Sequence, residues 1–435
     1  MEAGTLSIIL FATLLGLLAT GIWVGPVLLA VGFIAIEFFT PAPVGSLLAS
    51  TVWDASWNWA LTALPLFVWM GEILFRTRLS SDMFNGLAPW VVRLPGGLLH
   101  VNIVGCGVMA AVAGSSAVTC ATVGRMSIPE LRKRGYDENL SIGTLAGSGT
   151  LGLLIPPSIM LIVYGVLAQQ SISRLFIAGV LPGLMIIGIF MAYVSFRSIL
   201  NPKLAPTEKF DMSLIEKLKA SRHLIPVIGL ILCVIGSIYG GYATPTEAAT
   251  VGVIGALILA WVTKSLSWTS FMESLMGGVR TSCMISFILV GAAFLSVALG
   301  FTGVPKILGG YVEALNLTPG MLIVMLTILY IFLGCFLEGV SMMVLTAAVV
   351  LPMVQNAGID LLWFGVFTVI VVEMAQITPP VGFNLFVLQG MTGRDIMSVT
   401  RASVPFFFLM LLGIFIITLF PEIVLWPVQF MLQRG

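Results

Sequence analysis

The stretch GSGTLGLLIPPSI, at residues 147–159, combines three glycines with two adjacent prolines. Proline lacks the backbone N–H that a helix needs, and glycine is a weak helix former. Because the sequence on both sides is apolar, this stretch predicts a helix that is broken inside a membrane. A second interruption, QITPPVGFN at residues 376–384, predicts another broken helix in the C-terminal half.

The composition predicts an integral membrane protein built from helices. Of its 435 residues, 59% are hydrophobic and 9% are charged, with a mean hydropathy of +1.10. Soluble domains usually carry about 25% charged residues. Apolar runs of about 20 residues recur along the chain, which is typical of spanning helices rather than barrel strands.

Several functional classes are excluded by the residues that the chain lacks. The net charge is +1 without a long basic tract, so nothing indicates nucleic-acid binding. The five cysteines form no CxxC pair, and two histidines are too few for a multi-histidine metal centre. The sequence contains no P-loop and no nucleophile–base pair, which argues against an enzyme or an ATP-driven pump.

Hydropathy predicts ten crossings, and two of them are the broken helices. The predicted spans are 5–20, 22–40, 56–75, 139–170, 177–197, 223–242, 246–264, 281–300, 362–390 and 403–425.

Two further apolar regions, 98–127 and 318–354, do not fit single spans. Each is too long for one crossing, yet too short or too interrupted for two crossings of about 20 residues with a loop. A re-entrant hairpin fits better, in which the chain turns at a small polar tip and leaves on the side where it entered. Such a tip is tolerated in a membrane only where it is buried in protein or lines a wet cavity.

Basic residues predict the orientation of the chain. Seven surround the first hairpin and six lie in 197–222, whereas Lys306 alone flanks the second hairpin. By the positive-inside rule, the first hairpin and the linker 198–222 face the cytoplasm and the second hairpin faces outward. With ten crossings, both termini are then periplasmic.

The interruptions recur with the same spacing in the two halves. Pro95 precedes the Ser115 tip by 20 residues, as Pro319 precedes Gly339. From Ser115 to Pro156 is 41 residues, and from Gly339 to Pro379 is 40. Each half reads as a span, an amphipathic connector (79–97 or 303–320), a hairpin and a broken helix. Hairpins that enter from opposite sides make the repeats inverted, which is typical of secondary transporters.

The predicted organisation follows from this repeat. Its parts are scaffold helices in 1–55, a first inverted repeat in 56–197, a cytoplasmic linker in 198–222, scaffold helices in 223–264, a second inverted repeat in 281–402, and a C-terminal helix in 403–435.

The interruptions concentrate glycines, prolines and small polar side chains. Unwound carbonyls and hydroxyls suit sodium, and half-helix N-termini suit an anion. The predicted sodium ligands are Gly114, Ser115, Gly147, Ser148, Glu338, Gly339, Gln376, Thr378 and Pro379. The predicted substrate-binding residues are Ser116, Thr119, Gly149, Thr150, Ser341 and Asn384.

Four glutamates lie in apolar segments, where ionisable groups are functional candidates. Glu338, beside the second tip, is the strongest of them. Glu72 and Glu373 could equally bond to neighbouring helices, and Glu37 is expected at an interface. Proton coupling through a glutamate therefore stays open beside sodium coupling.

Four motifs in order resemble the large membrane subunit of tripartite ATP-independent periplasmic (TRAP) transporters, the DctM-like family. They are AGSSAVTCATVG, GSGTLGLLIPPS, GGYATPTEAATVG (240–252) and ITPPVGFNLFV. The third also predicts a helix start, with Thr244 or Thr246 near the cap and Glu247 in the first turn.

The resemblance implies an all-helical elevator-type transporter related to divalent-anion sodium symporters, in a bacterial inner membrane. It implies import of a small organic anion, often a carboxylate, coupled to Na⁺. One sodium site would use Ser115 with 147–150, and the other the Gly339 tip with Thr378 and Pro379. Two partners are implied, a small membrane subunit of about four helices and a periplasmic substrate-binding protein.

Two other classes stay open at this stage. A stand-alone sodium- or proton-coupled organic-anion symporter would need no binding protein. The other class is a channel or a membrane-embedded enzyme, and a channel would conduct without a cation gradient. The sequence does not select among sialic acids, C4-dicarboxylates, keto acids and sulfonates as substrates.

Overall fold

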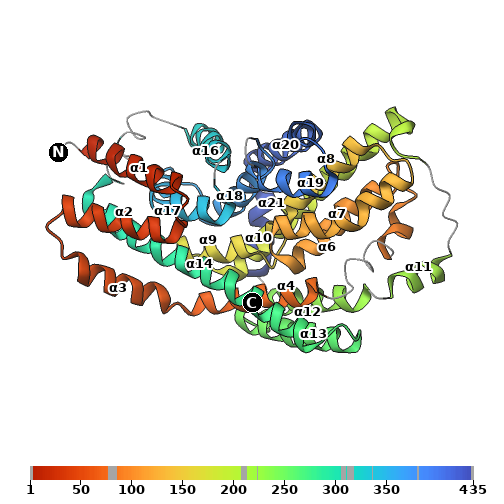
Figure 1. Ribbon diagram of the computed structural model, residues 1–435, viewed down its shortest axis with the longest axis horizontal. Coiled ribbons are helices and arrows are strands. Elements are labelled where there is room, and N and C mark those ends of the chain that lie inside the picture. Colours follow the sequence, from red (N-terminus) through yellow and green to blue (C-terminus); the bar gives the residue numbers. More distant parts are fainter. Residues whose placement is uncertain are drawn as a thin grey trace.

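The computed structural model describes residues 3–432 except 77–85, 207–212, 223, 305–309, 311–317, 336 and 380–381. Within these ranges the regular structure is helical, without a β-strand (Figure 1). Figure 1 shows an elongated bundle in which α2, α3 and α14 run lengthwise together, while α6 and α7 lie toward the opposite end. The prediction of an all-helical chain is confirmed for the described residues.

The N-terminal half contains α1 Ala3–Ala19, α2 Val24–Phe39, α3 Val44–Ser56, η1 Trp59–Thr62, α4 Ala63–Phe75, α6 Leu99–Ala113, α7 Ser116–Lys133, α8 Glu138–Gly149, η2 Thr150–Leu153, α9 Ile159–Leu167 and α10 Ile172–Leu200. The rest contains η3 Pro202–Leu204, α11 Leu214–Ser221, α12 Ile225–Tyr239, α13 Pro245–Val262, α14 Trp268–Thr302, α16 Pro319–Gly334, α17 Gly339–Asn356, α18 Leu361–Ala375, α19 Phe383–Thr392, α20 Ile396–Leu419 and α21 Glu422–Leu432.

Both predicted interruptions are confirmed. In the first, α8 ends at Gly149 and a 3₁₀ turn, η2, precedes α9. In the second, α18 ends at Ala375 and α19 begins at Phe383. The hairpin arms are also separate helices, α6 with α7 and α16 with α17. Their entry from opposite sides of a membrane stays a prediction, as does the inverted relation of the halves.

Five of the described helices are individually long and apolar enough to span a bilayer, namely α10, α13, α14, α17 and α20. Shorter apolar helices, including α2, α4 and α18, account for other predicted spans. The total of ten crossings stays a prediction.

Several predicted boundaries differ from those of the helices. Helix α3 was not predicted because its 13 residues mix apolar side chains with Asp54, serine and threonine. Helix α14 begins at Trp268 rather than 281, because Ser267 caps it and Glu273 lowers the local hydropathy. The predicted domain boundary at 402 falls inside α20. The second connector, 303–320, lies mostly outside the described residues.

Glycines allow α2 and α14 to pack closely along their length. A Cβ on Gly25 would lie 2.7 Å from the Phe287 ring, and one on Gly32 would lie 2.8 Å from Phe294. Small residues at the interface allow the backbones of two membrane helices to approach closely. This pair therefore forms a firmly packed part of the bundle, apart from the interruptions.

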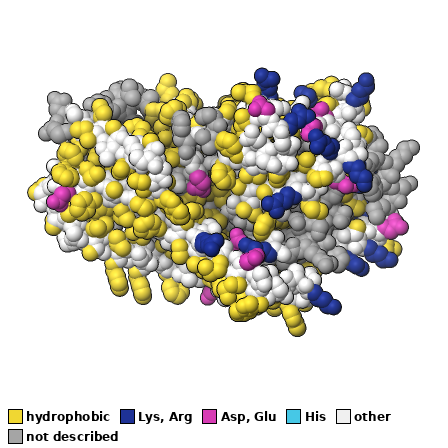
Figure 2. Space-filling model, viewed as in Figure 1, with side chains coloured by type: hydrophobic (Ala, Val, Ile, Leu, Met, Phe, Trp, Pro, Cys, Tyr) yellow, Lys and Arg dark blue, Asp and Glu magenta, His cyan; other side chains and the backbone are white. Residues whose placement is uncertain are grey.

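Charged side chains are unevenly distributed over the surface. In Figure 2, Lys and Arg gather toward the end that contains α7, α8 and α11, whereas the opposite end of this face is mainly hydrophobic. The apolar surface is what a lipid environment requires, and the basic end is the one that the charge rule assigns to the cytoplasm.

Candidate functional site

The first hairpin turns at Gly114 and Ser115. Gly114 ends α6 with a φ of +56°, a left-handed conformation that glycine adopts without strain. Ser115 is extended and precedes α7. A Cβ on Gly71 of α4 would lie 2.5 Å from the Val112 carbonyl oxygen, so α4 packs directly on the end of α6.

The first broken helix lies against this turn. A Cβ on Gly152 of η2 would be 2.7 Å from both the Ser115 carbonyl oxygen and the Ser116 Cα atom. One on Gly149 would be 2.9 Å from Cys120 Cβ. The structure therefore brings the 147–153 segment and the Ser115 tip together, as the sequence predicts.

The polar side chains of this segment bond within the bundle. The Ser148 hydroxyl donates to the Asn102 carbonyl oxygen at 3.3 Å, and the Thr150 hydroxyl donates to the Gly147 carbonyl oxygen at 2.5 Å. Phe406 of α20 fills the space beside Gly147. Both hydroxyls therefore bond away from the Ser115 tip.

The second tip is capped by Glu338. Its carboxylate accepts hydrogen bonds from the Ser341 backbone N–H at 3.2 Å and from the Ser341 hydroxyl at 3.3 Å. Glu338 is exposed, whereas Ser341 and Gly339 are buried. A Cβ on Gly339 would lie 3.8 Å from Gln376 Nε2, so this tip adjoins the second broken helix.

One backbone hydrogen bond spans the interruption of the second broken helix. The Asn384 N–H donates to the Gln376 carbonyl oxygen at 3.2 Å, across the interruption. The Thr378 hydroxyl donates to the Met374 carbonyl oxygen at 3.0 Å. Thr378 is half-buried, and Pro379 is exposed with its carbonyl oxygen 3.1 Å from Cys335 Sγ.

A hydrogen bond joins the two halves at the interruptions. The Ser116 hydroxyl, on α7, donates to Glu373 Oε1, on α18, at 3.2 Å. Helix α7 also packs on α19, where the Met391 side chain occupies the space beside Gly124. The first hairpin therefore contacts both segments of the second broken helix.

Several buried polar atoms on the helices of this contact lack hydrogen-bond partners. Among the described residues, no hydrogen bond reaches Thr119 Oγ1, Glu373 Oε2, Gln376 Nε2 or either amide atom of Asn384. We call Ser116, Thr119, Glu373, Gln376 and Asn384 the buried polar cluster; each is at most 7% exposed. Buried polar groups are normally paired, so such a cluster indicates a ligand or ion site.

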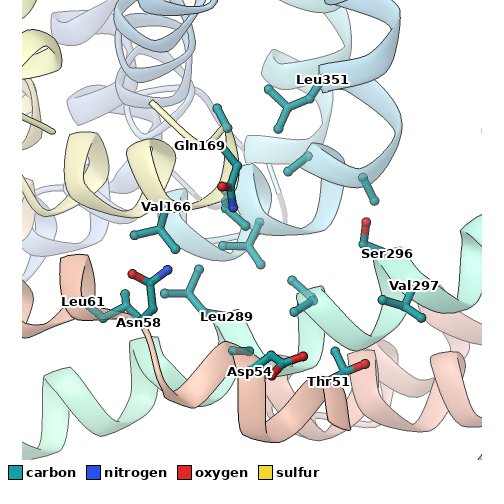
Figure 3. A pocket seen from close by; sticks show the side chains of 18 of the residues that line it. Thr51, Asp54, Asn58, Leu61, Val166, Gln169, Leu289, Ser296, Val297 and Leu351 are labelled. Carbon is teal, nitrogen blue, oxygen red and sulfur yellow. The ribbon is translucent and has the colours of Figure 1, made fainter. Parts of the chain in front are cut away.

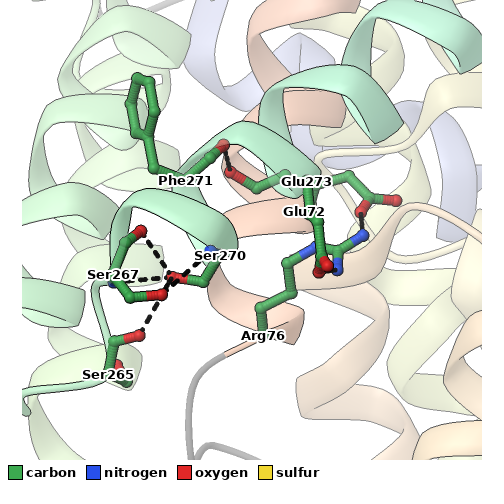
Figure 4. A network of polar contacts seen from close by, with 8 residues as sticks. Glu72, Arg76, Ser265, Ser267, Ser270, Phe271 and Glu273 are labelled. Atoms are coloured by element: carbon green, nitrogen blue, oxygen red, sulfur yellow. Dashed lines mark hydrogen bonds and ion pairs between the residues drawn. The ribbon is translucent and has the colours of Figure 1, made fainter.

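Glu373 was not among the predicted site residues. The available signal was a carboxyl in an apolar helix three residues before the break, but the sequence does not reveal its contact with Ser116. Glu72 serves a different role, because it accepts from Arg76 at 3.3 Å and Arg76 pairs with Glu273 at 2.6 Å (Figure 4). Arg76 joins α4 to α14 in this network, whereas the bond of Glu72 itself stays at the end of its own helix.

A cavity of about 580 Å³ lies between α3, α14 and the far ends of α9 and α17 (Figure 3). Its polar lining residues are Thr51, Asp54, Asn58, Gln169, Ser296 and Gln355. Helices α9 and α17 begin at the first interruption and at the second tip, respectively. The cavity is therefore bordered by helices that carry the candidate site, although it does not include the cluster.

The chain matches the model of a known transporter family over most of its length. A family model described as "Tripartite ATP-independent periplasmic transporter, DctM component" matches residues 11–423.

Curated relatives match nearly the whole chain. A C4-dicarboxylate TRAP transporter large permease protein from Pseudomonas aeruginosa is 30% identical, over 90% of this chain and 91% of that protein. An ectoine/5-hydroxyectoine TRAP large permease protein from Ruegeria pomeroyi is 32% identical, over 84% and 85%. An isethionate TRAP permease protein named DctMQ, from Oleidesulfovibrio alaskensis, is 31% identical, over 92% of this chain and 63% of that protein.

Among solved structures, the YdaH transporter of Alcanivorax borkumensis has a similar fold. The TM-score is 0.61 at 14% identity, with 88% of this chain and 87% of that chain covered. This likeness concerns the fold alone.

Proposed function

The chain belongs to the DctM component family of tripartite ATP-independent periplasmic transporters, and we propose that it imports a small organic anion in symport with sodium. The observation that carries this proposal is the buried polar cluster, which lies where the first hairpin meets the second broken helix. Interrupted helices that face each other in the protein interior are where secondary transporters bind substrate and coupling ions.

Sodium coupling is supported by the donor atoms at both tips. Ser115 lies against the η2 turn, and Thr378 and Pro379 lie at the second break, so hydroxyl and carbonyl oxygens are concentrated there. Oxygen donors suit a hard alkali cation, and the free N–H groups at half-helix starts suit a carboxylate or sulfonate. The names of the relatives support a small organic solute without selecting one.

Family membership also supports the proposed assembly. We expect a small membrane subunit and a periplasmic substrate-binding protein as partners, in a bacterial inner membrane with periplasmic termini. A stand-alone symporter is disfavoured, since the matched family is tripartite by description. The chain itself is expected to act as a permease and not as an enzyme. An elevator movement, with hairpins and broken helices moving against α2, α13 and α14, is the expected mechanism.

Uptake by proteoliposomes tests this function. The full chain, its small subunit and its binding protein would be assayed with labelled C4-dicarboxylate, isethionate and ectoine, in sodium or in choline. We expect uptake to require sodium, and Ser115→Ala and Thr378→Ala to raise the sodium concentration needed. Ser46→Ala and Thr250→Ala, which remove exposed hydroxyls bonded to their own helices, serve as controls. Unchanged sodium dependence in both site variants would contradict the ligand assignment.

A further inference from the structure

Glu373 is a buried carboxylate without a cationic partner. Its side chain is 0% exposed, and no Lys, Arg or His of the described residues forms an ion pair with it. A bare carboxylate in an apolar interior is strongly unfavourable, because removing it from water costs several kcal/mol. Within the part of the chain that the structure describes, the Ser116 hydroxyl is the one hydrogen-bond donor to this carboxyl group.

Two helices that carry unpaired polar atoms, α7 and α19, pack on each other, and α7 also bonds to Glu373. Glu373 Oε2 has no partner, and Thr119 Oγ1 is likewise unpaired one turn along α7 from Ser116. The Asn384 amide is unpaired at both atoms, so it can present its oxygen in either orientation. A carboxylate, a hydroxyl and an amide oxygen form the kind of all-oxygen donor set that hard cations prefer.

We propose that Glu373 binds a sodium ion directly, at Oε2, together with Thr119 and Asn384. The proposal rests on the sodium coupling proposed above and adds a charged ligand that the sequence did not predict. Sodium bound there makes a neutral pair with the carboxylate, which allows an anionic substrate to approach.

The side-chain N–H groups of Gln376 and Asn384 have a different role from the oxygen atoms that bind sodium. Gln376 Nε2 and Asn384 Nδ2 are buried donors without acceptors among the described residues. Once sodium neutralises Glu373, these N–H groups can donate to a carboxylate or sulfonate oxygen. Sodium binding should therefore precede anion binding.

Equilibrium binding of ²²Na⁺ tests the proposal without any organic substrate. The full-length protein in nanodiscs would be titrated with sodium at constant ionic strength, balanced by choline. We expect Glu373→Gln to bind one fewer sodium ion per chain than the unmodified protein. Thr119→Val, which keeps the shape and removes the hydroxyl, should raise the half-saturating sodium concentration several-fold. Glu37→Gln, an exposed glutamate on α2, is the matched control and should bind normally.

The outcomes distinguish this site from the proposed function. An unchanged isotherm in Glu373→Gln would overturn the site, while sodium-dependent uptake could still hold through Ser115 and Thr378. No sodium binding by the unmodified protein would overturn both. If Glu373→Gln leaves sodium binding intact but abolishes the effect of a proton gradient on uptake, the occupant is a proton and the proposal fails. If that variant does not fold, an unchanged Thr119→Val isotherm overturns the proposal instead.

Discussion

Gly152 is the residue that lets the first broken helix touch the first hairpin tip. The two nearest atoms to a Cβ at this position, the Ser115 carbonyl oxygen and Ser116 Cα, both belong to the backbone. A flexible side chain could move aside, but these atoms can move only with the tip itself. The contact between the two interrupted segments therefore requires glycine at position 152, because any side chain there would meet the backbone of the tip.

Gly152→Ala should destabilise the protein and lower uptake. Overpacking of this kind costs about 1–3 kcal/mol, and here the strain falls on the hairpin tip. Thermal unfolding in nanodiscs and sodium-dependent uptake would measure the two effects. Gly188→Ala, on α10 with nothing within 4 Å of the added Cβ, is the control and should leave both unchanged. Equal melting temperatures for the two variants would contradict the packing argument.

The two glutamates near the site illustrate what sequence could and could not reveal. Glu338 was favoured because it adjoins a tip, and the structure places it there as an exposed cap of α17. Glu373 is the buried one, bonded to a serine 257 residues away in the chain. Helix α18 is apolar apart from Thr368 and Glu373, so its hydrophobic periodicity does not show which side meets α7. Only the tertiary contact distinguishes the two carboxyls.

At the scale of elements, local signals were the most reliable. The predicted start of α13 is confirmed, since Thr244 and Glu247 form a capping box there. The two Pro-Pro interruptions are also confirmed, because proline acts on its own helix and needs no distant partner. Helix α3 was missed for the converse reason, since a short helix of mixed polarity resembles a loop when only long apolar runs are sought.

Helix α11, in the linker, has a pH-sensitive cap. The Ser213 backbone N–H donates to Glu216 at 2.8 Å, and its hydroxyl donates at 3.0 Å. These two bonds, the backbone one first, lower the pKa of the Glu216 carboxyl below its ordinary value of 4.5. A lowered pKa in the folded helix means that the cap stabilises α11 above about pH 4.5 and is lost as the pH falls through the lowered value.

We therefore expect the first turn of α11 to lose protection from hydrogen exchange on acidification from about pH 6 to about pH 3, after correction for intrinsic rates. Glu216→Gln provides the control, because glutamine can accept the same bonds but does not titrate. Its α11 should show no such pH dependence. An equal loss of protection in both proteins would rule out this carboxyl as the cause.

At the scale of the whole molecule, the sequence indicated which segments are interrupted but not how they are combined. Nearly equal spacing predicted matching hairpins and broken helices, and the observed helix ends are where this spacing places them. It did not predict that α7 of the first half would bond to α18 and pack on α19 of the second. That combination depends on side-chain fit across the bundle, which no local pattern encodes.

The uneven distribution of Lys and Arg predicts which side of the membrane each end of the molecule faces. The basic end includes α11, whereas α17 ends away from it, near the cavity of Figure 3. With the native cysteines replaced, Lys219→Cys on α11 and Asn356→Cys at the end of α17 are both exposed positions. An impermeant maleimide should label Asn356→Cys in intact cells and Lys219→Cys only in inverted vesicles, because basic segments stay in the cytoplasm. The reverse pattern would invert the proposed orientation. Labelling of both from one side would contradict hairpins that enter from opposite faces.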